Sequence, residues 1–270
     1  NVGFGQYIDM YDTGLRHESG YISLVKTGIF SQTVGNARLA SLQIDAGSLK
    51  VVNTLLLAGE LSVAQDGNLV VGHDEWQGLY DYDVQVNDGG VLRLGSGFGS
   101  LTGTPYTEDG VQKTGNTILL NGGGVLGMLD ADWSNENEMV VNAGGKAFVL
   151  DTTGYDPDSM TASGNSHVMT LNGTVKPGGA SGTIIVKNGN AGKNGRVVLG
   201  AANTWDGIYQ VTDHAALELA HAGALNTKAG VELQGAASRL DVKAGTVSYA
   251  ASVKLAGAGA SVNTLNSSSL

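Results

Sequence analysis

The sequence predicts an all-β protein built as a parallel β-helix, a solenoid in which each turn of chain stacks on the one before. Three observations favour this fold class. A short phrase, a glycine-containing turn followed by alternating apolar residues, recurs along the chain; glycine is unusually common; and helical patterns are scarce.

The recurring phrase sets the spacing of the predicted turns. The step from Gly47 to Gly67 is 20 residues, and the step from Gly67 to Gly89 is 22 residues. An antiparallel sandwich would place its turns roughly every 8–12 residues. A repeat of this kind cannot bury its own apolar face, so its neighbours must stack on it. The phrase occupies residues 45–51, 65–71, 87–94, 142–150 and 228–233.

Composition supports the same class. Glycine accounts for 42 of 270 residues, about twice the usual share, and proline for only 3. Charged residues make up 15%, so uncharged polar side chains must cover much of the surface. Such side chains can form ladders along stacked strands.

Short apolar runs bounded by Asn-Gly, Asp-Gly and Gly-Gly dipeptides predict the strands. The clearest runs are residues 55–57, 117–120, 139–141 and 183–186. The alanines of residues 215–225 favour helix, but Leu217 and Leu219 alternate with polar or small residues, so we expect strand there. The residues predicted to point inward and stack are Val51, Val71, Leu94, Leu120, Val141, Leu150, Val186, Leu199, Leu219 and Leu233.

Two stretches break the period, residues 95–115 and residues 151–166. Both predict loops or elaborated turns that project from the rod. Such loops often carry function in solenoids, and the alternative is a solvated insertion without a role.

Net charge and cysteine content limit the binding partners and cellular locations that we expect for this chain. The formal net charge is −10, without a basic patch, which disfavours binding to nucleic acid and insertion into anionic membranes. The absence of cysteine suits a chain exported through the periplasm. No apolar run reaches about 18 residues, so we expect no membrane-spanning helix. Because Asn1 is not a natural initiator, we expect residues 1–270 to be one unit excised from a longer chain.

Residues 203–219 resemble the passenger-associated repeat of bacterial autotransporters. That repeat contains Asn-x-Tyr/Trp-x-Gly, which Asn203, Trp205 and Gly207 match, and ends in a turn with a glycine, where this chain has His214 and Ala215. The upstream half of the repeat is matched by residues 184–189 and 197–200, and a more degenerate copy spans residues 24–49.

The resemblance implies a right-handed parallel β-helix displayed at the bacterial surface by type V secretion. It implies a C-terminal outer-membrane barrel as the partner that anchors the passenger, which we expect to lie outside this sequence. It also implies that residues 180–270 form an autochaperone-like folding region. The candidate folding nucleus is Trp205, Gly207, Tyr209, Leu217 and Leu219.

Catalytic motifs are not recognisable. No histidine lies in a nucleophile or zinc-protease motif, and the turn at His73 is expected to be a solvated loop. We therefore predict no cofactor and no metal site. Carboxylates cluster in residues 74–88 and 130–138, and aromatic residues beside carboxylates can bind sugars. The alternative is acidic loops whose aromatic residues cap the core. The candidate ligand-binding aromatics are Trp76, Tyr80, Tyr82, Trp133 and Tyr155.

The sequence thus predicts a non-enzymatic passenger segment that acts as an adhesin. Its expected partner is a host surface molecule or another copy of itself. Two alternatives remain open. The chain could be the non-catalytic stem and folding module of a secreted autotransporter enzyme, or a polysaccharide-degrading β-helix.

Overall fold

The computed structural model describes residues 22–29, 32–57, 61–63, 67–71, 84–94, 106–108, 111–113, 118–129, 131–156, 161–212, 214–243 and 252–265. Every regular element in these ranges is a β-strand, and none of them contains a helix. The predicted all-β class is confirmed to this extent.

Most strands belong to two parallel sheets, so the predicted parallel pairing is also confirmed. The larger sheet has 16 strands and divides at β2 (Gln32–Ile44) into two arms. Residues 32–39 of β2 pair with β3, the first strand of the long arm, and residues 42–44 pair with β4, the first strand of the short arm. β1 (Ile22–Lys26) pairs with the second half of β2.

The long arm runs in the order β3 (Gly47–Leu57), β5 (Gly67–Val71), β7 (Val91–Leu94), β11 (Val125–Met128), β14 (Phe148–Asp151), β19 (Thr183–Lys187), β21 (Ile208–Val211), β23 (Gly230–Leu233) and β25 (Ser252–Leu255). The short arm comprises β4 (Leu61–Val63), β6 (Val84–Val86), β10 (Ile118–Asn121), β13 (Met139–Asn142) and β18 (Val175–Pro177). The six-stranded sheet comprises β12 (Trp133–Asn135), β17 (Val168–Leu171), β20 (Arg196–Leu199), β22 (Ala216–Leu219), β24 (Arg239–Lys243) and β26 (Ser261–Leu265).

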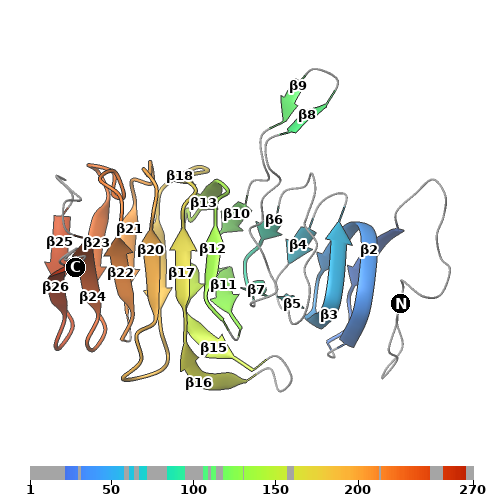
Figure 1. The fold of residues 1–270 in the computed structure, drawn as a ribbon, viewed down its shortest axis with the longest axis horizontal. Coiled ribbons are helices and arrows are strands. Elements are labelled where there is room, and N and C mark those ends of the chain that lie inside the picture. The colour runs from blue at the N-terminus through green and yellow to red at the C-terminus, as the bar shows by residue number, and fades with distance from the viewer. Residues whose placement is uncertain are drawn as a thin grey trace, which may run out of the picture.

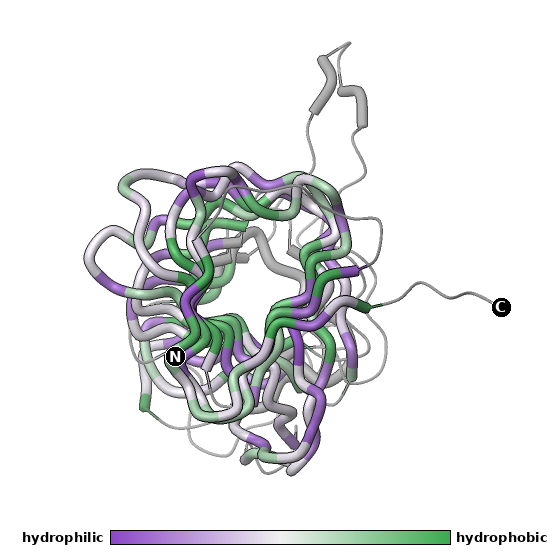
Figure 2. The backbone as a smooth tube through the Cα atoms, turned by 90° about the vertical axis from the view of Figure 1, so that its left-hand side faces the viewer, coloured by the Kyte–Doolittle hydropathy of each residue, from purple (hydrophilic) through white to green (hydrophobic). Residues whose placement is uncertain are grey.

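The chain visits the short arm, the long arm and the six-stranded sheet in that order, and we call one such passage a rung. β10, β11 and β12 form one rung, β13, β14 and β17 the next, and β18, β19 and β20 the one after. Successive rungs lie side by side along the long axis in Figure 1. In Figure 2, viewed along that axis, the backbone winds repeatedly around one interior.

One ladder of aliphatic side chains lines the interior along the long arm. Each member is the register partner of the next, and all but the last are at most 2% exposed. The ladder is Leu49, Leu69, Leu92, Leu126, Leu150, Val186, Val211, Leu233 and Leu255. Burying this apolar surface is what makes stacking favourable, since each buried aliphatic side chain contributes roughly 1.5–3 kcal/mol.

The predicted inward residues agree with this arrangement. All eight whose side chains are described are at most 2% exposed: Leu94, Leu120, Val141, Leu150, Val186, Leu199, Leu219 and Leu233. The side chains of Val51 and Val71 lie outside the described part of the structure.

The recurring glycine has a conformational reason. Gly47, Gly89, Gly123 and Gly145 have φ between +73° and +95°. Gly47 is the first residue of β3, and the other three lie shortly before β7, β11 and β14. Residues other than glycine adopt this left-handed region only at a cost, because Cβ approaches a carbonyl oxygen. At these four positions the recurring phrase marks a left-handed turn by which the chain enters the long arm, whereas Gly230, in another copy of the phrase, does not adopt this conformation.

The two breaks in the period contain antiparallel strand pairs. β8 (Tyr106–Glu108) pairs with β9 (Val111–Lys113), and β15 (Thr153–Tyr155) pairs with β16 (Ala162–Ser166). The β15–β16 hairpin projects from the lower edge of the body in Figure 1. Residues 215–225 are strand only at β22, and a turn region follows it, so the expected strand there was too long.

Candidate functional site

The predicted folding nucleus is buried in the C-terminal half. Trp205 is 0% exposed and Tyr209 is 1% exposed, and both belong to the continuous apolar core. Leu217 and Leu219 are 0% exposed and lie on the interior side of β22. The structure therefore gathers these four side chains in one core, and their role in folding remains a prediction.

Gly207 is required for close approach. A side chain at this position would collide with the carbonyl oxygen of Gly182 and would lie 2.6 Å from the indole ring of Trp205. The Asn-x-Trp-x-Gly motif thus contains a bulky core residue and, two residues later, a position where the neighbouring rung leaves no room.

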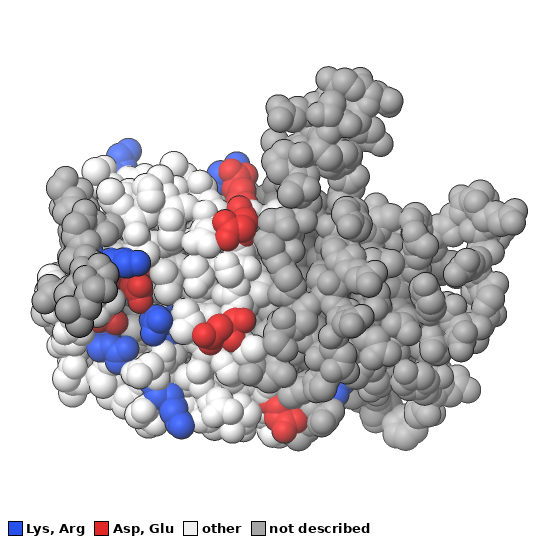
Figure 3. All heavy atoms as spheres, in the orientation of Figure 1, with Lys and Arg blue, Asp and Glu red and all other residues white. Residues whose placement is uncertain are grey.

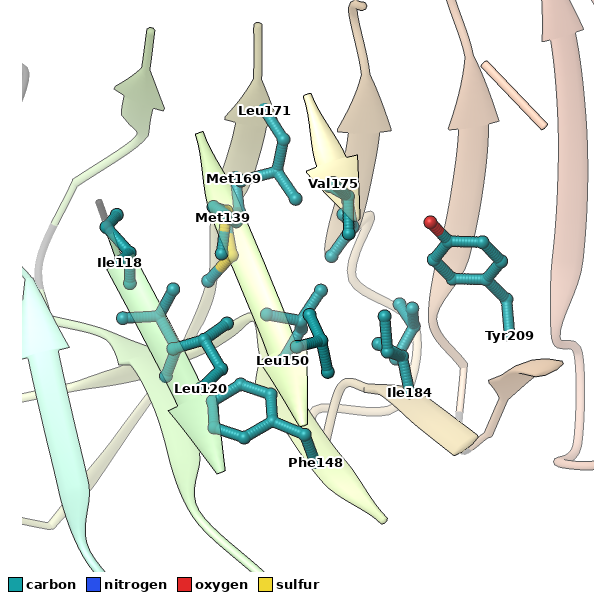
Figure 4. Close-up of a cluster of buried hydrophobic side chains, with 14 of the residues drawn as sticks. Ile118, Leu120, Met139, Phe148, Leu150, Met169, Leu171, Val175, Ile184 and Tyr209 are labelled. Atoms are coloured by element: carbon teal, nitrogen blue, oxygen red, sulfur yellow. The ribbon is translucent and has the colours of Figure 1, made fainter. Parts of the chain in front are cut away.

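Tyr209 projects across the interior, and its hydroxyl points toward Val175 in Figure 4. Its hydroxyl oxygen is buried without a hydrogen-bond partner, and burial raises the pKa of the phenol well above its usual value. Beside it is a cavity of about 10 Å³ lined by apolar side chains from β10, β13, β14, β17, β18, β19 and β21. A cavity of that size holds one water at most, so it is a packing defect and not a ligand site.

The five candidate ligand-binding aromatic residues lie in different environments, and the structure describes only two of them. Trp133 is 3% exposed in β12, in register with Met169, so the expectation that it lies in a binding loop is wrong. Tyr155 ends β15, and the guanidinium of Arg93 stacks on its ring at 3.8 Å from the centroid. The remaining three, Trp76, Tyr80 and Tyr82, lie outside the described residues.

The carboxylates of residues 130–138 that are described do not face one another as a pair. Asp132 lies 3.5 Å from His167 Nδ1, and Glu138 pairs with Lys176 at 2.5 Å. Within the described ranges, no group of three or more His, Asp or Glu side chains could hold a metal ion. From the cluster at residues 74–88, only Asp88 is described, and it forms an ion pair with Lys146.

A buried amide that sequence reasoning did not single out joins the β15–β16 hairpin to the following rungs. Asn188 is 0% exposed, and its Oδ1 accepts a hydrogen bond of 2.7 Å from the hydroxyl of Ser166. Its Nδ2 lies within 3.4–3.5 Å of the carbonyl oxygens of Asn190, Lys193 and His214. Its position beside Gly189, within the upstream half of the repeat, was the only sequence signal.

Residues 24–49, which resemble a more degenerate copy of the repeat, also contain a buried polar group. Lys26 is 7% exposed, and its ammonium donates to the carbonyl oxygens of Gly28 and Ala46. Burial lowers the pKa of this ammonium below its usual value. The lysine thus fastens the turn that precedes β3.

Polar ladders, expected from the composition, occur at the ends of the short-arm strands. Asn142 donates to Asn121 at 3.4 Å, Asn121 donates to Asn87 at 2.7 Å, and Asn87 donates to Ser62 at 3.2 Å. Each bond joins neighbouring rungs on the outside of the molecule. Amide stacks of this kind stabilise parallel, in-register strands.

The outer surface of the long arm carries a row without charge. Between the inward-facing positions, seven register partners in succession are uncharged, and each is partly exposed. We call this the outer row: Ser48, Asn68, Val91, Val125, Val149, Ile185 and Gln210. Four neighbours in it are β-branched aliphatic residues, so an apolar stripe lies on the outside of the sheet.

Charged side chains elsewhere on the surface are sparse. On the face shown in Figure 3, the described surface is mostly uncharged, with acidic and basic side chains in small scattered groups. No described segment is a helix long and apolar enough to cross a bilayer.

Comparison of the chain with protein-family models, with curated proteins and with solved structures returned no match.

Proposed function

We propose that this chain is a right-handed parallel β-helix from the passenger of a bacterial autotransporter, and that it acts at the cell surface as a self-associating adhesive module. The passenger would reach the surface through the periplasm and outer membrane, anchored by a C-terminal barrel. Support for the solenoid comes from the parallel register of successive rungs and from their shared interior.

Support for the passenger assignment comes from the repeat-like motif of residues 203–207. Its asparagine, tryptophan and glycine each occupy a position where the stack of rungs needs that residue type: a buried amide, a core aromatic and a site without room for Cβ. A motif whose residues all serve rung stacking is what a repeat of a β-helical passenger requires.

The outer row is the observation that carries the adhesive role. Each copy has a formal net charge of −10, so copies repel one another over roughly 8–10 Å at physiological salt. A charge-free row across seven strands is where two copies could approach with least repulsion. Its valines and isoleucine would contribute apolar area, and its amides could hydrogen-bond across the contact for about 0.5–1.5 kcal/mol each.

The test compares two double variants of the purified chain by sedimentation velocity. Val125→Lys with Val149→Lys adds two charges to the outer row at neighbouring register positions. Ser134→Lys with Thr170→Lys adds the same charges at neighbouring outward positions of the six-stranded sheet, as the matched control. We expect the first pair to abolish association and the second to leave it.

Equal association of both double variants would reject the outer row as the contact. If the unmodified chain remains monomeric at high concentration, self-association is rejected, and binding to a host molecule or the stem alternative becomes the preferred function. Cleavage of a glycan by the purified chain would instead favour the polysaccharide-degrading alternative.

A further inference from the structure

Within the described residues, the last strand of the short arm is β18, although the long arm and the six-stranded sheet continue into later rungs. The last residue of β18 is Pro177, which has no backbone N–H. We call the side of the rungs formed by the short arm the third side. In two later rungs, which contain β21–β22 and β23–β24, residues 203–205 and 223–226 lie on this side, and these segments contain no strand. The backbone groups there need partners that a strand would ordinarily supply.

Val175 shows where the missing strand would pair. The carbonyl of the preceding Thr174 accepts from Met139, and the N–H of Gly178 donates to Val141, both in the previous rung. The N–H and C=O of Val175 point the other way, toward the next rung.

Asn203, Thr204 and Trp205 form hydrogen bonds with the backbone N–H and C=O of Val175. The carbonyl oxygen of Val175 accepts from the backbone N–H groups of Thr204 and Trp205, each at 3.0 Å. The N–H of Val175 donates to Oδ1 of Asn203 at 2.7 Å. A side-chain oxygen thus takes the place of the backbone carbonyl that the next strand would present.

The same amide reaches forward to the following rung. Asn203 Nδ2 donates to the carbonyl oxygen of Ala224 at 2.9 Å, and its backbone N–H donates to Gly223, also at 2.9 Å. Asn203 is 7% exposed, and Val175 and Ala224 are at most 2% exposed. One buried side chain therefore satisfies a donor in the rung before it and an acceptor in the rung after it.

We propose that Asn203 is a positioning residue that closes the third side of the C-terminal rungs, fastening three consecutive rungs where the strand ladder has ended. This role needs an acceptor and a donor on one short side chain. Asparagine offers both, whereas an ionised carboxylate only accepts. The contact fastens the backbone of Trp205 beside the core, since the backbone N–H of Trp205 and the side chain of Asn203 both bond to Val175.

The isosteric variant Asn203→Asp makes the role measurable through pH. The introduced carboxylate can still accept from Val175 but would face the carbonyl oxygen of Ala224 in a buried place. Burial and this facing oxygen raise the pKa of the new carboxyl in the folded chain above its unfolded value. The Asn203→Asp chain is then most stable below the pKa that this carboxyl has in the unfolded chain, because the neutral carboxyl can donate to Ala224. That stability is lost as pH rises through the pKa that the carboxyl has in the folded chain.

The experiment is urea unfolding of the purified chain at about pH 4 and about pH 7, each variant compared with wild type at the same pH. For Asn203→Asp we expect the folding equilibrium constant to fall at least about tenfold at pH 7 and to recover most of that loss at pH 4. The matched control is Asn226→Asp, a more exposed amide that donates to the carbonyl of Thr204 at 3.0 Å. It should lose less at pH 7 and show little pH dependence.

Equal losses for the two variants at pH 7, or the same deficit for Asn203→Asp at both pH values, would overturn the proposal. If Asn203→Asp does not fold at either pH, the proposal is tested instead by the rate of hydrogen exchange of the Val175 backbone amide in the wild-type chain. The Val175 amide should then exchange as slowly as amides within β19, and rapid exchange would overturn the proposal. Neither measurement depends on surface display or self-association, so its outcome is separate from that of the adhesive function.

Discussion

At the scale of single residues, backbone conformation explains a departure from the autotransporter repeat. His214 and Ala215 stand where the repeat has glycine, and His214 has φ of 61°. Ala237 and Gly259, with φ of 53° and 73°, occupy the corresponding turn of the next two rungs. Backbone bonds from His214 to Ala236 and from Ala237 to Ala258 stack these turns. The left-handed conformation is therefore kept although the glycine is not.

Replacing His214 by glycine should stabilise the chain. Relief of the left-handed strain outweighs the added flexibility of the unfolded chain, and we expect a gain of about 0.5–1 kcal/mol in the free energy of unfolding. The measurement is the urea midpoint. The control is Gly145→Ala, at φ +95° with no atom near the added methyl, which should lose about 1 kcal/mol. A loss of stability in His214→Gly would contradict the backbone explanation.

Trp205 tests the folding nucleus. Truncating this buried tryptophan in Trp205→Ala should cost roughly 3–5 kcal/mol and should lower surface display of a passenger that contains this chain. Tyr209→Phe is the control, because it removes a buried hydroxyl that has no partner and should be neutral or slightly stabilising. Surface display of Trp205→Ala at the wild-type level would contradict the assignment of Trp205 to the folding nucleus.

At the scale of elements, inside and outside alternate along each long-arm strand. In β14, Leu150 faces the interior at 2% exposure, and Val149 belongs to the outer row. Leu150→Asp buries an unpaired charge and should cost several kcal/mol, enough to prevent folding. Val149→Asp should cost less than about 1 kcal/mol. Circular dichroism and urea unfolding check both, and similar losses for the two variants would mean that the inside–outside alternation is wrong.

The sequence located several long-arm strands well because four of their entry turns have a glycine at positive φ close to the start of alternating apolar residues. It located the third side poorly. The short-arm strands have three or four residues, and beyond β18 the described residues on that side form no strand. The repeat motif marks Asn203 in the sequence, but its contacts with Val175 and Ala224 become visible only when the rungs on either side of it are placed.

The sequence-based prediction of exposed aromatic residues failed for a related reason, the shortness of the strands. Trp133 lies among acidic residues in the sequence, which suggests an exposed loop, yet strand alternation turns its ring inward and leaves Ser134 and Asp132 outside. A three-residue strand is too short for periodicity to reveal this. Tyr155 lies in a projecting hairpin, and its ligand-binding role stays a prediction; its contact with Arg93 joins residues 62 positions apart.

At the scale of the whole molecule, charge governs association. Two copies with a formal net charge of −10 repel, and added salt screens that repulsion without weakening apolar contacts. We therefore expect self-association of the purified chain to strengthen between about 20 mM and about 150 mM salt. Sedimentation velocity at both salt concentrations measures this. Association confined to low salt would mean that acidic and basic groups pair across the contact, against the outer-row proposal.

Successive rungs stack as parallel strands in one register, and a disulfide between neighbouring strands tests this arrangement directly because the chain contains no cysteine of its own. Gln210 of β21 is the register partner of Glu232 of β23, whereas Ile208 is the partner of Gly230. Parallel neighbours lie about 4.8 Å apart, which suits a disulfide, and a diagonal pair offset by two residues does not. Oxidation of the double variant Gln210→Cys with Glu232→Cys should form an intramolecular disulfide rapidly, and Ile208→Cys with Glu232→Cys should not. An antiparallel pairing centred on Tyr209 and Val231 would reverse the two results, and that reversal would contradict the account.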